Sequence, residues 1–167
     1  YKRQGPTSLT KPNVERVINV DSADQMLEAC ESSLPADIAV CAAAVADYKI
    51  ANKEIAKIKK DGSRQNIILE ENPDILERLS KRNHLRPKLV VGFAAETSNL
   101  ERNSDEKLNK KGCDWVLGNN VSENSIFNQD TNKIYFTSKL YSENWELMTK
   151  KEVAKKLCQK ISLHLNN

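Results

Sequence analysis

Apolar and polar residues alternate along the chain in a way that predicts strands separated by helices. Continuous apolar runs are typical of strands that are buried on both faces of a sheet. A run of this kind occurs at 38–45, and 89–93 is also fully apolar. Further candidate strands occur at 17–20, 66–69 and 115–117. A later segment, 133–137, alternates polar with apolar side chains, which predicts a half-exposed strand at a sheet edge. The succession of strands and helices indicates an α/β fold, with a mainly parallel sheet flanked by helices.

Residues that satisfy terminal backbone groups mark where the helices begin and end. Asn72 is expected to cap a helix that carries Ile75, with Pro73 in the first helical position. A helix over about 98–111 is expected to stop at Gly112, because glycine is favoured just past a helix end. Capping boxes that open two further helices are formed by Ser22 with Gln25 and by Thr149 with Glu152.

The composition restricts the class of protein. A length of 167 residues suits one domain. The net charge of +3, from 26 basic and 23 acidic residues, is too balanced to indicate a nucleic-acid partner. The sequence has no apolar run of membrane-spanning length and no signal-peptide pattern at its start. We therefore expect a cytoplasmic protein without a membrane partner.

The cysteines and histidines carry no metal or redox motif. The four cysteines are Cys30, Cys41, Cys113 and Cys158. Because none stands in a C-x-x-C pair, we expect free thiols, with Cys30 and Cys158 buried in helices. His84 and His164 are isolated from each other and from acids at a ligand-like spacing, so both are expected on the surface.

Polar segments follow the candidate strands, at the edge where the carboxyl ends of parallel strands would meet. Ligands of α/β sheets bind at that edge. The polar segments are 46–48, 71–74, 94–97 and 118–120. The sequence contains neither a G-x-x-x-x-G-K-[ST] loop nor a G-x-G-x-x-G turn. Lysines would therefore have to supply the positive charge for any bound phosphate.

Lysines stand at two places that could serve this edge. Lys57 opens a basic stretch in the loop-like region over about 50–65. Lys107 and Lys111 are four residues apart on one helix face, whereas Lys110 points to another side. A lysine at such a position is more often a solvated surface residue. The spacing thus supports an anion-binding α/β domain and leaves its ligand open.

Six blocks of sequence together resemble phosphopantothenate–cysteine ligase, the synthetase half of the bacterial bifunctional coenzyme A biosynthesis flavoprotein. The blocks are A-A-A-V-A-D-Y-K (42–49), K-I-K-K (57–60), E-N-P-D-I-L (71–76), V-V-G-F-A-A-E-T (90–97), K-L-N-K-K-G-C-D-W-V-L-G-N-N-V (107–121) and F-N-Q-D-T-N (127–132). They occur in the order that the family shows. Six ordered blocks are far more specific than any one of them.

The resemblance implies an activity, co-substrates and an assembly. Ligases of this type join 4′-phosphopantothenate to L-cysteine, use CTP and Mg²⁺, and pass through an acyl-cytidylate. The family has a Rossmann-like fold and works as a homodimer. By this resemblance, residues 1–167 form the C-terminal portion of a single synthetase domain with a flexible flap at about 50–65. FMN is expected only where a decarboxylase domain is fused to it.

The resemblance also assigns site residues. Lys57, on the flap, is expected to take part in catalysis by closing over the nucleotide phosphates. The other positions implied to bind the nucleotide are Cys41, Ala42, Ala43, Asp47, Asn72, Pro73, Asp74, Ile75, Phe93, Lys107 and Lys111. Metal ligands are not assigned, and none of the four cysteines receives a catalytic role.

Two other classes of function remain open. A nicotinamide-dependent oxidoreductase could use a similar sheet, although it would normally carry the G-x-G-x-x-G turn. A non-catalytic nucleotide-binding or assembly fragment, or a plain subunit-interface fragment, is the other alternative. Binding of CTP, of NADH or of neither would favour the ligase, the oxidoreductase or the assembly role respectively.

The family has an earlier segment, with a glycine-rich turn, to which no part of this sequence corresponds. We therefore expect a sheet and a site that are incomplete at the N-terminal side. The 167-residue chain alone is predicted to bind CTP weakly and to show no ligase turnover. The measurement is pyrophosphate release from CTP in the presence of phosphopantothenate and cysteine. Full turnover by this chain alone would contradict the expectation.

Overall fold

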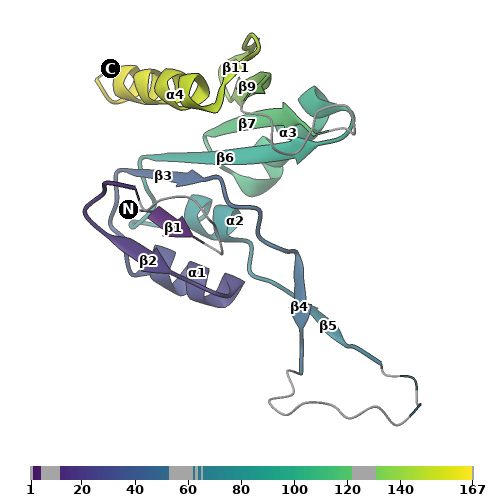
Figure 1. The fold of residues 1–167 in the computed structure, drawn as a ribbon. Coiled ribbons are helices and arrows are strands. Elements are labelled where there is room, and N and C mark those ends of the chain that lie inside the picture. Colours follow the sequence, from purple (N-terminus) through teal and green to yellow (C-terminus); the bar gives the residue numbers. More distant parts are fainter. Residues whose placement is uncertain are drawn as a thin grey trace.

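A mixed five-stranded sheet forms the centre of the protein (Figure 1). The structure is a computed structural model that describes residues 2–4, 12–52, 62, 64, 66–121 and 131–166. The strands of the central sheet, in spatial order, are β10 (Ser142–Asn144), β9 (Ile134–Ser138), β7 (Trp115–Asn120), β6 (Leu89–Glu96) and β3 (Ile38–Cys41). β3, β6 and β7 are parallel, and β9 and β10 are added antiparallel. The predicted Rossmann-like α/β class is confirmed.

Helices cover both faces of this sheet. The helices are α1 (Ala23–Glu31), α2 (Ile75–Ser80), α3 (Leu100–Lys111) and α4 (Lys150–Leu165). Leu76 of α2 and Leu108 of α3 pack on one face of the sheet, against Val90 and Val116. α4 covers the other face, as Figure 1 shows. Among the helices of the described residues, none is long and apolar enough to cross a bilayer.

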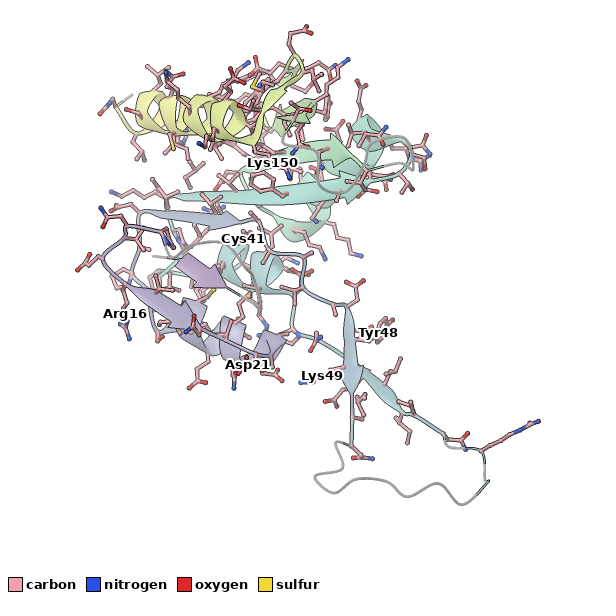
Figure 2. All side chains as sticks on the ribbon, in the orientation of Figure 1. Arg16, Asp21, Cys41, Tyr48, Lys49 and Lys150 are labelled. Atoms are coloured by element: carbon pink, nitrogen blue, oxygen red, sulfur yellow. The ribbon has the colours of Figure 1, made fainter. Side chains whose placement is uncertain are left out.

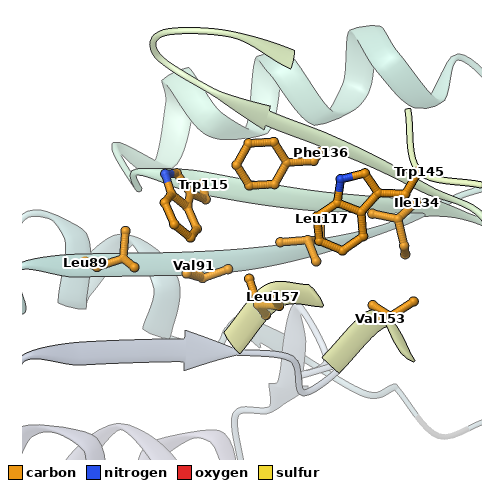
Figure 3. Close-up of a cluster of buried hydrophobic side chains, with 9 residues drawn as sticks. All are labelled: Leu89, Val91, Trp115, Leu117, Ile134, Phe136, Trp145, Val153 and Leu157. Atoms are coloured by element: carbon orange, nitrogen blue, oxygen red, sulfur yellow. The ribbon is translucent and has the colours of Figure 1, made fainter. Parts of the chain in front are cut away.

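The core under α4 is aromatic (Figure 3). Trp145 is 1% exposed and stacks on Phe136, with ring centroids 5.9 Å apart and ring planes 7° apart. Trp115 meets the same Phe136 edge-on at 5.4 Å. Val153 and Leu157 of α4 close the cluster on the side of this helix, which explains their four-residue spacing in the sequence. The free energy of burying these rings holds α4 on the sheet.

In the described part of the chain, three two-stranded sheets accompany the central sheet. β1 (Lys2–Gln4) and β2 (Val17–Asn19) form a parallel pair. β8 (Thr131–Asn132) and β11 (Met148–Thr149) form an antiparallel pair. β4 (Tyr48–Ile50) and β5 (Leu69–Glu71) form an antiparallel ribbon that projects away from the body in Figure 1. We call this ribbon the arm. The region predicted to be a flap, about 50–65, lies between these two strands in the chain, and most of it is outside the described residues.

Three strand predictions are corrected by the structure. The strand predicted at 66–69 is found at Leu69–Glu71 (β5), exposed in the arm and outside the central sheet. The run 38–45 does not form one strand buried on both faces, because β3 ends at Cys41 and residues 42–44 are exposed. β3 is the last strand of its sheet, so one of its sides lacks the cover that the apolar run suggested. The segment 133–137 is not a half-exposed edge strand either. β9 lies between β7 and β10, and its first four residues are buried between α3 and α4.

The cysteine prediction is confirmed in part. All four cysteines are free. Cys113 is fully buried and Cys30 is partly buried, whereas Cys158 is exposed on α4. The prediction for Cys158 is therefore wrong, because the buried stripe of α4 runs through Val153 and Leu157 instead.

Arg86 ties the sheet to the ends of two helices. Its guanidinium group donates to both carboxylate oxygens of Asp114 at 2.9 Å, and its Nε donates to the Ser80 carbonyl at the end of α2 at 2.7 Å. Asp114 in turn accepts from the Val90 amide at 2.7 Å, just before β7 begins. Both charged side chains are only 25% exposed, so this pair is shielded from solvent. Charge-assisted bonds of this kind contribute more than exposed ion pairs.

Replacing Arg86 with Met is expected to lower the free energy of unfolding by about 2 kcal/mol, because Asp114 loses its charged hydrogen-bond partner. Urea denaturation followed by circular dichroism measures the change. Arg102→Met is the matched control, since its partner Glu106 and Arg102 itself are 62% and 79% exposed. The control should leave the unfolding midpoint nearly unchanged. Equal effects of the two substitutions would show that the Arg86 contacts contribute no special stability.

Candidate functional site

The carboxyl edge of the parallel strands has a step. Cys41, the last residue of β3, is level with Gly92 of β6, and β6 continues to Glu96. The backbone of Phe93–Glu96 therefore extends past the end of β3 while still pairing with β7 on its other side. Edges of this kind, where the strands of an α/β sheet end, are the usual ligand sites. Figure 2 shows Cys41 at the end of β3, where the chain turns towards the arm.

Asn72 fastens the chain that leaves β3. Its amide N–H donates to the Asp47 carbonyl, and its side-chain Nδ2 donates to the Ala46 carbonyl, each at 2.8 Å. The Oδ1 atom of Asn72 is buried and, among the described residues, has no hydrogen-bond partner. Asn72 therefore does not cap α2 as the sequence predicts. It holds the segment after β3 beside the start of α2.

Asp74 is the residue that caps α2. Its Oδ1 accepts a hydrogen bond of 2.8 Å from the Glu77 amide, which satisfies one of the free N–H groups of the first turn. Its Oδ2 is ion-paired with the ammonium group of Lys111, at the far end of α3. One carboxylate thus joins the start of α2 to the end of α3.

We call Asp74, Glu77, Lys107 and Lys111 the cluster, and the opposite charges of Asp74 and Lys111 in it stabilise each other. Burial acts to raise the pKa of Asp74, but the hydrogen bonds from Lys111 and the Glu77 amide, with the charge of Lys107, hold the pKa below its ordinary value. The hydrogen bond to Asp74 raises the pKa of Lys111, although burial of the ammonium group opposes this. Asp74 is therefore ionised and Lys111 protonated at neutral pH.

Lys107 is held differently from Lys111. Its ammonium group donates to the Phe93 carbonyl at 2.7 Å, directly on the step of β6. The ion pairs found among the described residues do not include Lys107, although its charge does act on Asp74 from beyond ion-pair distance. The two lysines, one helical turn apart, thus approach the same edge with different partners.

Cys41 lies at this edge as a neutral thiol. Burial raises its pKa to about 12, so the thiolate is not populated at neutral pH. A neutral thiol is a weak nucleophile. Cys41 is therefore not assigned a role as a nucleophile.

The structure brings together most of the positions that the sequence assigns to a site. Ala42 and Ala43 are exposed just beyond β3, and Asp47 is exposed before β4. Ile75 is 7% exposed and packs inward from the first residue of α2, so its side chain is part of the core. Pro73 is half-buried in the turn before α2. Lys57 lies outside the described residues.

A depression of about 650 Å³ adjoins this edge. It shares the turn 72–74 with the cluster and continues along the outer side of α2 past Arg78 and Arg82 to His84. Arg78 and Arg82 are not among the site residues that the sequence predicts. Their spacing of four residues predicts that both lie on one helix face. This spacing could have indicated a basic surface along the helix. Arg82 is ion-paired with Glu31 of α1.

Comparison with known proteins agrees with this architecture. Residues 4–164 match the family described as DNA/pantothenate metabolism flavoprotein, C-terminal domain. The coenzyme A biosynthesis bifunctional protein CoaBC of Haemophilus influenzae is 38% identical over 158 residues, which cover 94% of this chain and 39% of that protein. The chain thus spans about two fifths of the length of this curated relative.

Solved structures share the fold. The crystal structure of the C-terminal domain of a coenzyme A biosynthesis bifunctional protein CoaBC superposes with a TM-score of 0.75 at 30% identity, covering 98% of this chain and 73% of that chain. A Cab2 variant in complex with phosphopantothenate-cysteine superposes with a TM-score of 0.63 at 17% identity, covering 90% of this chain and 55% of that chain. The chain therefore belongs to the family of DNA/pantothenate metabolism flavoprotein C-terminal domains.

Proposed function

We propose that this chain supplies the nucleotide-binding edge of a phosphopantothenate–cysteine ligase, which joins 4′-phosphopantothenate to L-cysteine with CTP. The observation that carries the proposal is the convergence of Lys107, Lys111 and Asp74 at the carboxyl edge of the parallel strands. The similarity to CoaBC proteins supports the same reaction class. The choice of CTP over ATP rests on the resemblance of the sequence blocks.

The first step of the proposed reaction needs positive charge. A carboxylate is a poor acyl donor, so the carboxylate oxygen of phosphopantothenate attacks the α-phosphorus of CTP and pyrophosphate leaves. The product is an acyl-cytidylate. Substrate carboxylate, substrate phosphate and triphosphate are all anions, and their approach is opposed by charge repulsion. Lys107, which is in no ion pair among the described residues, lies where it can reduce this repulsion.

The second step needs little from the protein beyond placement. The amine of cysteine attacks the acyl carbon, CMP leaves, and the amine proton passes to solvent or phosphate. An enzyme nucleophile is not required, in agreement with the neutral Cys41 thiol. We propose that Lys57 closes over the phosphates and shields the acyl-cytidylate from water. That role rests on the K-I-K-K block alone.

Mg²⁺ would neutralise part of the triphosphate charge in this reaction. In the part of the chain that the structure describes, three or more His, Cys, Asp or Glu side chains do not gather into a metal site. Magnesium at nucleotide sites is commonly held mainly by phosphate oxygens, with one or two protein carboxylates. Its protein ligands are not assigned, and we propose that Asp47, which is exposed at the edge, contacts the nucleotide.

We propose that the chain forms a homodimer through the arm. Tyr48, Ile50 and Leu69 share one face of the arm and are 56%, 45% and 57% exposed. The other face carries Lys49, which is ion-paired with Asp24 of α1 at 2.6 Å. Figure 2 shows Tyr48 and Lys49 on opposite sides of β4. The pair with α1 therefore turns the apolar face away from the body, where a second copy could cover it.

We also propose a cytoplasmic location. The support is that all four cysteines are free, which is usual where thiols are kept reduced. Oxidised cysteines in protein isolated from its source without reductant would contradict this location.

Titration calorimetry with CTP, ATP and NADH tests the proposed function. The chain is expected to bind CTP in preference to ATP, and not to bind NADH. The protein and nucleotide concentrations must suit weak binding, because the chain alone is expected to hold CTP weakly. Preference for NADH would support an oxidoreductase, and absence of binding for all three would support an assembly role.

Lys107→Met is expected to weaken CTP binding by about tenfold, because a charge-assisted contact to phosphate is lost. Lys110→Met is the matched control on the same helix, since it removes the same charge from an exposed side chain that points elsewhere. The control should bind CTP as the unsubstituted chain does. Equal weakening by both substitutions would reduce the role of Lys107 to net charge alone.

Ile50→Ser is expected to shift the chain from dimer to monomer, because it places a hydroxyl on the apolar face of the arm. Sedimentation equilibrium measures the mass. Leu147→Ser is the control, since Leu147 is 67% exposed and lies outside the arm. A monomeric unsubstituted chain, or a dimer that Ile50→Ser leaves intact, would contradict the proposed interface.

A further inference from the structure

Each carboxylate oxygen of Asp74 already has a partner within its own chain. Oδ1 accepts from the Glu77 amide at 2.8 Å, and Oδ2 is ion-paired with Lys111. Lys111 is the more buried partner, with 18% of its side chain exposed against 37% for Asp74. A second carboxylate oxygen, Oε2 of Glu77, lies 3.8 Å from the same ammonium group. The strongest contact of Asp74 is therefore with a lysine of its own chain.

Charge argues against a direct contact between this carboxylate and a polyphosphate. Both groups are anionic at neutral pH, because the pKa of Asp74 lies below its ordinary value. Two like charges at short range repel each other strongly where solvent is partly excluded. A phosphate that approaches this edge would be attracted by Lys107 and by the N–H groups of Lys111 that point away from Asp74.

Lysine side chains need an anchor if they are to hold a fixed position. The flexible four-carbon stem of a lysine loses rotamer freedom when its ammonium group binds a ligand. Asp74 is itself fixed, because it caps α2 and cannot turn without losing the Glu77 amide. Because Asp74 is fixed at the start of α2, its ion pair holds the ammonium group of Lys111 at a fixed place relative to α2.

From this geometry we infer that Asp74 is a positioning residue, which acts on the bound anion through Lys111 and does not itself contact that anion. The inference rests on the proposed function for the identity of the anion, a nucleoside triphosphate. It departs from the direct nucleotide contact that the resemblance implies for Asp74. The backbone of the turn 72–74 stays available for such contacts.

Asp74→Asn is the substitution that separates the two roles of the carboxylate. Asparagine is as good a helix cap as aspartate, so α2 should keep its first turn while the charge is lost. Circular dichroism checks that the fold persists. Glu106→Gln is the matched control, since it removes one carboxylate charge from the exposed face of α3.

The first readout does not depend on any ligand. The ¹³Cε chemical shift of Lys111 is followed against pH by NMR, with the signal assigned through Lys111→Arg. In Asp74→Asn the pKa of Lys111 is expected to be lower than in the unsubstituted chain, and in Glu106→Gln it should be unchanged. An unchanged Lys111 pKa in Asp74→Asn would mean that the ion pair does not hold in solution, and the inference would be overturned.

The second readout is CTP affinity in a double-substitution cycle. Asp74→Asn is expected to weaken CTP binding by at least about threefold in the unsubstituted background, and not to weaken it in the Lys111→Met background. Weakening by the same factor in both backgrounds would show that Asp74 contacts the nucleotide directly, which overturns the positioning role and leaves the proposed function intact. Absence of CTP binding by the unsubstituted chain would instead overturn the proposed function, and the positioning role would fall with it. In that case the NMR readout would still report whether the ion pair exists.

Discussion

The ion pair between Asp74 and Lys111 is the constraint on which the candidate site depends. It connects the first residue before α2 with the last residue of α3, two helices that pack on the same face of the sheet. Because Asp74 also caps α2, the start of this helix and the end of the lysine side chain are fixed together. Because β6 extends past the end of β3, the backbone of Phe93–Glu96 is the part of the sheet that lies next to the lysines of α3.

The two lysines of α3 differ in their partners, because Lys111 is in an ion pair and Lys107 is not. This difference determines how strongly the edge can attract an anion. Lys111 is compensated by Asp74 and has Glu77 nearby, whereas Lys107 contacts the neutral Phe93 carbonyl. A site with only compensated charges would attract a polyanion weakly, and one with only uncompensated charges would repel itself before the ligand arrives. One lysine of each kind provides an ordered framework and a net positive charge in the same place.

Several features of this edge could be predicted from residue patterns. The buried runs 89–93 and 115–117 predict parallel strands, and the structure extends them to Glu96 and Asn120. The four-residue spacing of Lys107 and Lys111 predicts a shared helix face. Gly112 was expected to end this helix, and it does so at a φ of 69°, a conformation that glycine adopts without strain.

Other features depend on contacts between distant parts of the chain, which no local pattern encodes. Asn72 and Asp74 are both good capping residues, and the sequence favours Asn72 because Pro73 suits a first helical position. In the structure, carbonyl groups of Ala46 and Asp47 from the preceding strand connection engage Asn72, which leaves Asp74 to cap the helix. Likewise 133–137 reads as an edge strand until β10 and the two helices that bury it are in place.

By itself the sequence determined the α/β class, most of the helix boundaries and the family, because apolar periodicity, capping residues and ordered motif blocks are local properties. Only the tertiary structure decided which carboxylate neutralises Lys111, which carbonyl holds Lys107, and how far β6 projects past β3. These outcomes follow from strand register and helix packing, which set distances between residues that are far apart in the chain.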